Sequence, residues 1–490
     1  MSPGAGSGVT QAPVAGDQGG KPKPNSRIRN GIVVVAVAAI VWFLPVPHGL
    51  TVAAWRLFGI FLATLVGLIL QPLPLGAMAF LGLTVCALAK LLTPQQAVAG
   101  FGSTTIWLIV AAFLFARGFL KTGLGRRVAY LMMRRLGDST LKLAYALAFT
   151  DLIMSPAMPS ATARVGGVLF PITRGLCSGF QSEPGATARR MGTYLMQAVY
   201  QCDNIVCAMF LTSMAANPMV AAFAQKTVGV EITWQTWALA TSIPGLLTIL
   251  GIPYLLFKLS PPELKNTPEA KGIADTELAR LGPMSRAEKL VASVFFGCLL
   301  LWCTGSLNKI DPTVVAMLGV VAMVLTGVLD WKDILEEKGA WDTMIWMGSL
   351  MTLADGLVRI GFIPWFAKSV SGGLAGIPWV WALLILIIVY FYAHYAFASM
   401  TVHTTAMYVP FLSVAAAAGG PRLLVALSLG FLAPLSGGLT HFAGAGAPIY
   451  FGAGYVSQTE WWRNGFIVAL LNLVVFVGAG AIWWKIIGLW

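Results

Sequence analysis

Residues 160–171 have the sequence Ser-Ala-Thr-Ala-Arg-Val-Gly-Gly-Val-Leu-Phe-Pro, and residues 399–410 have the sequence Ser-Met-Thr-Val-His-Thr-Thr-Ala-Met-Tyr-Val-Pro. In both stretches a threonine follows the serine by two positions, a basic side chain follows the threonine by two, and a proline comes seven positions later. The second stretch begins 239 positions after the first. Because this spacing of four residue types occurs twice, it predicts an internal duplication.

Two further pattern pairs extend the duplication. Thr-x-Ile-Trp at 104–107 recurs at 343–346, again 239 positions later. With a slip of one residue, Gly-x-x-Lys-x-Gly at 118–123 also matches Gly-x-x-Arg-x-Gly at 356–361. Since all three pairs keep the same order, we predict that the repeats cover about 100–220 and 339–455.

The composition places these repeats in a membrane. The chain of 490 residues is 57% hydrophobic and 10% charged, whereas soluble proteins are about 45–50% apolar and about 25% charged. Its apolar runs have the length that crosses a hydrocarbon core of about 30 Å, and they lack the short alternating segments of a β-barrel. We predict an all-α polytopic membrane protein with about 11 transmembrane helices.

The distribution of charge predicts topology, not nucleic-acid binding. The net charge is +13, but the Lys and Arg residues lie mostly in short segments beside apolar runs, as the positive-inside rule describes. We therefore expect a multi-pass protein of the inner (plasma) membrane with a cytoplasmic N-terminus. The predicted organisation is a disordered cytoplasmic tail (1–30), a first half (31–257), a polar cytoplasmic linker (258–286) and a second half (287–490).

Each repeat motif predicts a break between two apolar helices. Ser160 and Thr162, like Ser399 and Thr401, are residue types that cap helix N-termini. Backbone at membrane depth is non-helical only where protein buries it or where it lines a watery cavity. We therefore predict re-entrant helical hairpins with tips at 160–162 and 399–401, and these hairpins make the two repeats inverted. Because helix N-termini attract anions, two facing tips would hold a dianion.

The basic residue of each motif has two interpretations. Arg164 lies in the first turn of a helix, where the macrodipole opposes a cation, and an arginine within an apolar span costs about 2.5–3.5 kcal/mol. In one interpretation Arg164 and His403 each neutralise one carboxylate of a bound anion. In the other, Arg164 snorkels to the membrane interface or pairs with a carboxylate such as Asp151 or Asp203.

A second irregular segment follows each hairpin. The Gly- and Pro-containing run at 437–448 cannot be a regular helix, and 212–218 is its counterpart in the first half. His394 precedes the second tip and belongs either to the site or to interfacial packing. We expect no metal site, because all six cysteines lie in apolar stretches. The predicted substrate-binding residues are Ser160, Ala161, Thr162, Arg164, Asn217, Pro218, Ser399, Met400, Thr401, His403, Thr440 and His441.

These motifs resemble the divalent anion/sodium symporter family, whose hairpin tips carry a Ser-Asn-Thr signature. Here Ala161 and Met400 replace both asparagines, which help to bind sodium in family members that use it. The chain is more similar to the exchanger branch, which includes bacterial citrate/succinate and tartrate/succinate antiporters and the plastid 2-oxoglutarate/malate translocator. The resemblance implies a homodimer in which a substrate-carrying domain moves like an elevator against a scaffold.

The sequence therefore predicts a secondary transporter that exchanges di- or tricarboxylates without sodium. If Arg164 stays charged, the empty site would cross the membrane reluctantly and return only when loaded. The alternative is a sodium- or proton-coupled symporter, and a histidine near pKa 6.5 would suit the proton. An enzyme is disfavoured because no G-x-S-x-G element occurs, and the absence of a nucleotide-binding loop argues against a primary pump. No cofactor is predicted.

Overall fold

The computed structural model describes residues 24–371 and 377–490, and over these ranges the chain is helical with no β-strand. Six helices are long and apolar enough to cross a bilayer by length and composition. One of the six, Trp379–Ala396, leads into the second hairpin tip, and the other helices beside a tip or an unwound segment are not among the six. The predicted total of about 11 spans therefore remains a prediction. The six lie at Ser26–Phe43, Val52–Leu70, Thr104–Thr122, Trp234–Leu259, Trp379–Ala396 and Gln458–Ile486.

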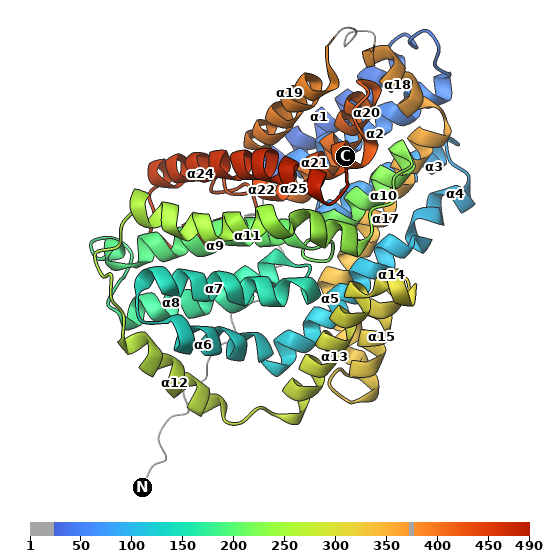
Figure 1. Ribbon diagram of the computed structural model, residues 1–490. Coiled ribbons are helices and arrows are strands. Elements are labelled where there is room, and N and C mark those ends of the chain that lie inside the picture. The colour runs from blue at the N-terminus through green and yellow to red at the C-terminus, as the bar shows by residue number, and fades with distance from the viewer. Residues whose placement is uncertain (1–23, 372–376) are drawn as a thin grey trace.

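One set of helices, here called the frame helices, packs mainly within itself. In Figure 1, α5, α13, α15 and α17 lie side by side on the right of the view, and α1, α2 and α3 adjoin them. The frame helices are α1 (Pro24–Phe43), α2 (Val52–Leu70), α3 (Leu75–Leu88), α4 (Pro94–Ala99), α5 (Thr104–Thr122), α13 (Arg286–Cys303), α15 (Pro312–Leu325), α16 (Trp331–Glu336) and α17 (Lys338–Arg359).

The second set, the hairpin helices, contains both repeat motifs. Figure 1 shows α7, α9, α11 and α24 side by side on the left. The set consists of α7 (Thr140–Met154), α8 (Phe170–Gly179), α9 (Gly192–Met209), α10 (Ala216–Val228), α11 (Trp234–Leu259), α19 (Trp379–Ala393), α20 (Met400–Ala417), α21 (Arg422–Gly430), α22 (Leu432–Leu435), α23 (Ala447–Gly452), α24 (Gln458–Leu473) and α25 (Gly480–Ile486). Connecting helices are α6 (Leu124–Leu136), α12 (Glu269–Leu281), α14 (Gly305–Asn308) and α18 (Phe362–Ser371).

The two hairpins keep the register that the sequence predicts. Helix α7 and helix α19 begin and end 239 positions apart, and each continues into a three-residue 3₁₀ turn, Ser155–Ala157 and His394–Ala396. Extended backbone follows, with φ −128° at Met158 and φ −115° at Phe397. The chain then becomes helical again, as a π-helix (Thr162–Leu169) leading into α8 in the first repeat and as α20 in the second. The duplication therefore determines where the backbone breaks.

A serine caps each restarted helix. The hydroxyl of Ser160 accepts a hydrogen bond from the amide of Ala163 at 3.2 Å, and that of Ser399 accepts one from Val402 at 3.4 Å. Thr162 and Thr401 lie inside the helices that follow and do not cap them. Of the four predicted capping residues, only the serines have that role.

Both predicted unwound segments are present. Helix α9 ends at Met209 and α10 begins at Ala216, while α22 ends at Leu435 and α23 begins at Ala447. The second segment packs directly on α9, because a Cβ atom at Gly438 would collide with the side chain of Gln201. A larger residue there would displace the amide of Gln201, which donates to the carbonyl of Gly438 at 3.0 Å.

The boundary of the predicted tail differs from the structure, and the predicted linker contains a helix. Helix α1 begins at Pro24, so residues 24–30 are helical, and residues 1–23 lie outside the described residues. The side chain of Asn30 donates to the carbonyl of Leu70 at 2.7 Å, which anchors α1 to the end of α2. The polar linker contains α12, and Thr140 Oγ1 donates to the linker carbonyl of Leu264 at 2.5 Å. The linker is thus docked against the start of α7.

Candidate functional site

Three of the four irregular segments, the first tip and both unwound segments, meet around α9. The hydroxyl of Thr212, in the first unwound segment, donates to the carbonyl of Pro156 beside the first tip at 2.6 Å. The α9 residue Tyr200 donates to Gly437 O in the second unwound segment at 2.7 Å. Tyr450 of α23 donates to Val165 O just beyond the first tip at 3.0 Å. Side chains from each repeat therefore hold the backbone of the other.

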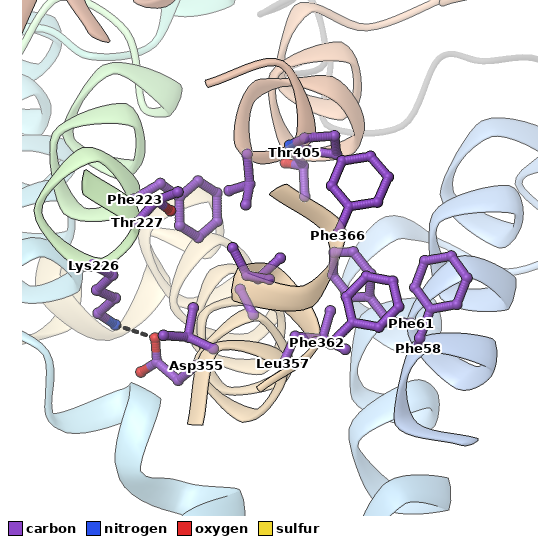
Figure 2. A pocket seen from close by; sticks show the side chains of 15 residues that line it. Phe58, Phe61, Phe223, Lys226, Thr227, Asp355, Leu357, Phe362, Phe366 and Thr405 are labelled. Carbon is purple, nitrogen blue, oxygen red and sulfur yellow. Dashed lines mark ion pairs between the residues drawn. The ribbon is translucent and has the colours of Figure 1, made fainter. Parts of the chain in front are cut away.

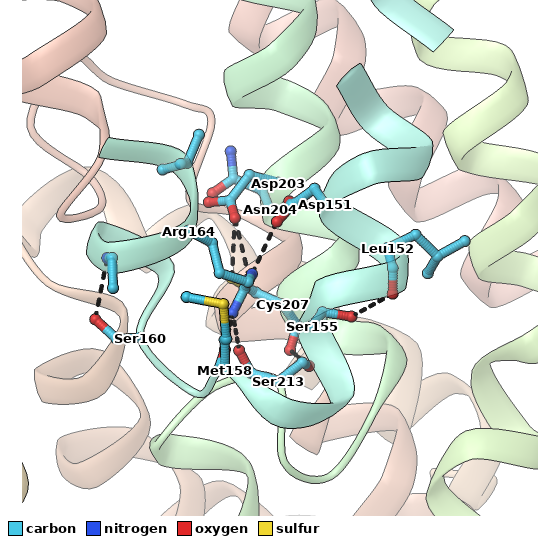
Figure 3. A network of polar contacts seen from close by, with 12 residues as sticks. Asp151, Leu152, Ser155, Met158, Ser160, Arg164, Asp203, Asn204, Cys207 and Ser213 are labelled. Atoms are coloured by element: carbon cyan, nitrogen blue, oxygen red, sulfur yellow. Dashed lines mark hydrogen bonds and ion pairs between the residues drawn. The ribbon is translucent and has the colours of Figure 1, made fainter. Parts of the chain in front are cut away.

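Arg164 lies at the centre of the first repeat's contacts and is fully buried. Figure 3 shows its guanidinium between the carboxylates of Asp151 on α7 and Asp203 on α9. Nε donates to Asp151 at 2.8 Å, and Nη2 donates to Asp203 at 3.0 Å. The remaining acceptors are the carbonyls of Met158 and Ser213, both bound by Nη1, and the Cys207 sulfur, bound by Nη2.

These contacts use all five N–H donors of the guanidinium. Of the two interpretations of Arg164, pairing with carboxylates is the one that the structure supports, and it involves Asp151 and Asp203 together. The expectation of an uncompensated positive charge in the empty site is therefore wrong. The physical reason is that α7 and α9 each place a carboxylate against the same guanidinium, a convergence that spacing alone does not show.

His403 has a different environment in the second repeat. Its Nδ1 lies 2.8 Å from Nδ1 of His394, whose Nε2 lies 2.9 Å from the carbonyl oxygen of Ala443. A carbonyl only accepts, so His394 donates from Nε2 and, when neutral, accepts at Nδ1. His403 then donates from Nδ1. Its Nε2 is left as a buried acceptor with no partner in the part of the chain that the structure describes.

This arrangement settles the position of His394. The side chain is completely buried and bridges the second tip to the second unwound segment through His403 and Ala443. It therefore contacts the predicted site residue His403 directly, which favours the interpretation of His394 as part of the site. Its nine-residue separation from His403 spans the hairpin turn.

Two other predicted residues have mainly structural contacts. Asn217 is buried and donates to the carbonyls of Cys207 and Phe210 at 2.8 and 2.9 Å, so it satisfies the broken end of α9. His441 accepts from the indole of Trp462 at 3.0 Å and is partly exposed. Pro218 and Thr440 are buried beside these breaks, Pro218 in the first turn of α10 and Thr440 in the second unwound segment.

The hairpin tips present the accessible polar groups. Ser160, Thr162, Ser399 and Thr401 are all partly exposed, while Ala161 and Met400 between them are buried. The hydroxyls of the two threonines make no hydrogen bond to any residue within 24–371 or 377–490, so their donors are available. Each lies beside a helix N-terminus, where free N–H groups favour an anion. The arrangement therefore combines two hydroxyl-bearing helix ends.

A separate pocket of about 70 Å³ lies between frame and hairpin helices. Figure 2 shows Phe58, Phe223 and Phe366 among its apolar walls and the Lys226–Asp355 ion pair, at 2.5 Å, on one side. Its lysine is already paired and its remaining walls are mainly apolar, which does not suit a dianion. The pocket belongs to the interface between the two sets of helices.

Paired hairpins and paired unwound helices define a membrane transporter of the broken-helix type. The chain belongs to the sodium:sulfate symporter family, since the model of the "sodium:sulfate symporter transmembrane region" matches residues 25–490. The predicted resemblance to the divalent anion/sodium symporters is confirmed. The predicted fold class is also confirmed, as an all-α polytopic membrane protein with two inverted repeats, re-entrant hairpins and broken helices.

Relatives extend over nearly the whole chain. It is 46% identical to the putative malate transporter YflS of Bacillus subtilis, over 94% of this chain and 96% of that protein. It is 44% identical to the chloroplastic dicarboxylate transporter 1 of Arabidopsis thaliana, over 96% of this chain and 85% of that protein. The crystal structure of the Alcanivorax borkumensis YdaH transporter shares the fold, with a TM-score of 0.51 at 12% identity over 94% of this chain and 98% of that one. The family consists of transporters, so the protein is not an enzyme.

Proposed function

We propose that the protein is a sodium-independent exchanger of di- or tricarboxylates in the class of succinate, malate, tartrate, citrate and 2-oxoglutarate. The observation that carries the proposal is the position of the Arg164 guanidinium. It binds the carbonyl of Met158 at the first tip and that of Ser213 in the unwound segment. In many transporters such unwound carbonyls coordinate sodium. Because the Arg164 guanidinium donates hydrogen bonds to these carbonyls, it takes the position that a sodium ion would occupy beside them.

The substrate class has two supports. Malate and dicarboxylates are the substrates in the names of the relatives, and the two tips offer the free hydroxyls of Thr162 and Thr401 at helix N-termini. One carboxylate of the substrate would bind at each tip, since two equivalent half-sites suit an anion with two charged ends. The neighbouring Ser160 and Ser399 shape the tips by capping.

Exchange follows from the free energy needed to move the empty binding site across the membrane. The Arg164 charge is already balanced by Asp151 and Asp203, so the barrier to an empty carrier is not a buried cation. The barrier comes from the exposed N–H groups and hydroxyls of both tips. When the empty carrier crosses, these groups would lose their hydrogen bonds to water and find no partners in the apolar interface. A bound dicarboxylate satisfies them, and the loaded site crosses more readily.

An elevator motion fits the division into two sets of helices. Both hairpins and both unwound segments belong to the hairpin helices. Between these helices and the frame lies the Phe-lined pocket, whose apolar contacts are non-directional and tolerate sliding. We propose that the hairpin helices carry the substrate past the frame helices. We further propose that the protein is a homodimer in the inner membrane, with its N-terminus in the cytoplasm.

Proton coupling is the second candidate, and one observation favours it. His403 Nε2 is a buried acceptor without a partner in the described part of the chain, so a proton taken up there would change the charge of the second tip. In that case uptake into vesicles would follow an imposed pH gradient. The exchanger would show no such dependence on the gradient.

The test uses purified protein in liposomes preloaded with succinate, with labelled succinate outside and either sodium or choline in the buffer. We expect uptake that requires internal dicarboxylate and is the same in both buffers. Uptake into empty liposomes driven by a sodium gradient would refute the exchanger and establish a sodium symporter. Uptake into empty liposomes driven by an inward proton gradient would establish the proton-coupled form.

A further inference from the structure

A second apolar cavity, of about 170 Å³, lies within the hairpin helices and away from the tips. It is bounded by α19, by α21 and α22, and by the π-helix Val474–Ala479 with α25. Its walls are almost entirely hydrocarbon and include Leu383, Ile387, Leu432, Leu435, Phe476 and Trp484. An apolar cavity of this size excludes water and accommodates several carbon atoms.

The cavity lies beside a face that contacts lipid. Helix α19 and the segment Gln458–Ile486 are both candidate membrane spans. Ile385 and Ile388 of α19 are 55% and 53% exposed, and Ile482 and Ile486 on α25 are 67% and 70% exposed. Large apolar side chains so exposed on membrane spans face hydrocarbon. The bilayer is therefore the source of any molecule that fills the space between these helices.

One end of the cavity has the composition of a membrane interface. Trp379 and Trp490 line it there, with ring centroids 6.3 Å apart, and Lys485 holds its ammonium 5.3 Å from the Trp490 ring centroid. Tryptophan concentrates at the level of lipid head groups, and a lysine beside it attracts anionic ones. A head group bound at Lys485 would place its acyl chain at the entrance of the cavity.

We propose that this cavity binds one acyl chain of an anionic phospholipid, with the head group at Lys485. The bound chain contacts α22, which ends at the second unwound segment, and α19, which leads to His394. It therefore braces the helix before the second tip and the helix before the second unwound segment. The site is independent of the substrate class proposed above.

The test uses the full chain in liposomes that contain a trace of phosphatidylglycerol with a diazirine near the end of one acyl chain. After irradiation, labelled residues are mapped by peptide mass spectrometry. We expect label on Leu432 and Leu435, which are only 2% and 1% exposed and which bulk lipid does not reach. Labelling confined to outward residues such as Ile385 and Ile482 would overturn the proposal.

Two variants make the mapping specific. Ala481 lines the cavity, so Ala481→Phe should fill it and lower labelling of residues 428–435 by about tenfold. Ile482→Phe adds an aromatic ring at the neighbouring, outward position and should leave labelling unchanged. Equal labelling in both variants and the wild type would also overturn the proposal. Ser428→Phe, which fills the cavity from its floor, repeats the test from another helix.

A comparison of two lipids tests whether the bound head group is anionic. Phosphatidylcholine with the same diazirine chain should label Leu432 several-fold less than phosphatidylglycerol does. The Lys485→Gln variant should abolish this difference. Equal labelling by the two lipids in the wild type would refute the anionic head group at Lys485 while leaving the acyl-chain site itself established by the label on Leu432.

Discussion

The two hairpin tips share a backbone but differ in their electrostatics. In the first, Arg164 has every donor bound and two carboxylates beside it. In the second, His403 shares one proton with His394 and has an unpartnered nitrogen within the described chain. A basic residue at one motif position therefore supplies a permanent charge in one repeat and a titratable pair in the other.

Equivalent positions on the hairpin arms explain this difference. Asp151 lies thirteen residues before Arg164, and the corresponding residue on the second arm is Tyr390, whose ring centroid is 4.5 Å from that of His403. Likewise Ser155 of the first turn corresponds to His394 of the second. Each repeat therefore places a suitable partner thirteen positions before its basic residue. The partner is a carboxylate for Arg164 and an aromatic ring for His403.

The largest expected effect comes from breaking the first network. Arg164→Ala leaves Asp151 and Asp203 buried without their counter-charge, and we expect a loss of about 3–5 kcal/mol of stability together with loss of exchange. The melting temperature and the monodisperse yield of detergent-solubilised protein measure it. Arg174→Ala is the matched control, because Arg174 is exposed on the same hairpin. Normal stability with loss of substrate binding would return Arg164 to the role of a substrate ligand.

The histidine pair should give a smaller effect. His394→Ala and His403→Ala each remove one side of the same buried hydrogen bond, at a cost of about 1–3 kcal/mol. Because the two residues act as one unit, the double variant should cost little more than either single variant. His441→Ala is the control, since His441 bonds Trp462 instead and should add independently. Additive losses at His394 and His403 would show that the pair is not energetically coupled.

The sequence predicted the breaks better than the contacts. The hairpin tips and unwound segments follow from local chemistry, because serine caps, glycine and proline act within a few residues of themselves. The offset of 239 positions then aligns the helix Thr140–Met154 in sequence with the helix Trp379–Ala393. Arg164 required long-range information, since Asp203 lies 39 residues away and approaches only when α9 packs on the hairpin. The sequence identified both carboxylates as candidate partners of Arg164. It did not decide whether Arg164 pairs with them or with the substrate.

Capping of the broken helices offers a third comparison of the repeats. Asn217 donates to two carbonyls at the end of α9, whereas Asn472 of α24 donates to one, Leu435 O, at the end of α22. We expect Asn217→Ala to cost about 1–2 kcal/mol and Asn472→Ala about 0.5–1.5 kcal/mol. Asn217→Asp keeps the shape but lacks the donors, so it should lose as much in thermal unfolding as the alanine variant. Wild-type stability of Asn217→Asp would show that shape, not hydrogen bonding, matters there.

The smallest effect on stability is expected where the hairpin helices meet the frame helices. Within residues 24–371 and 377–490, Lys226–Asp355 is the one ion pair that directly joins a hairpin helix, α10, to a frame helix, α17. Its side chains are 33% and 25% exposed, so Lys226→Ala should cost no more than about 1 kcal/mol. An elevator must break this contact in every cycle. Lys226→Asp should therefore alter the exchange rate more than the melting temperature, and Lys226→Asp with Asp355→Lys should restore it. Failure of the swapped pair to recover exchange would show that attraction between these charges does not hold the hairpin helices against the frame.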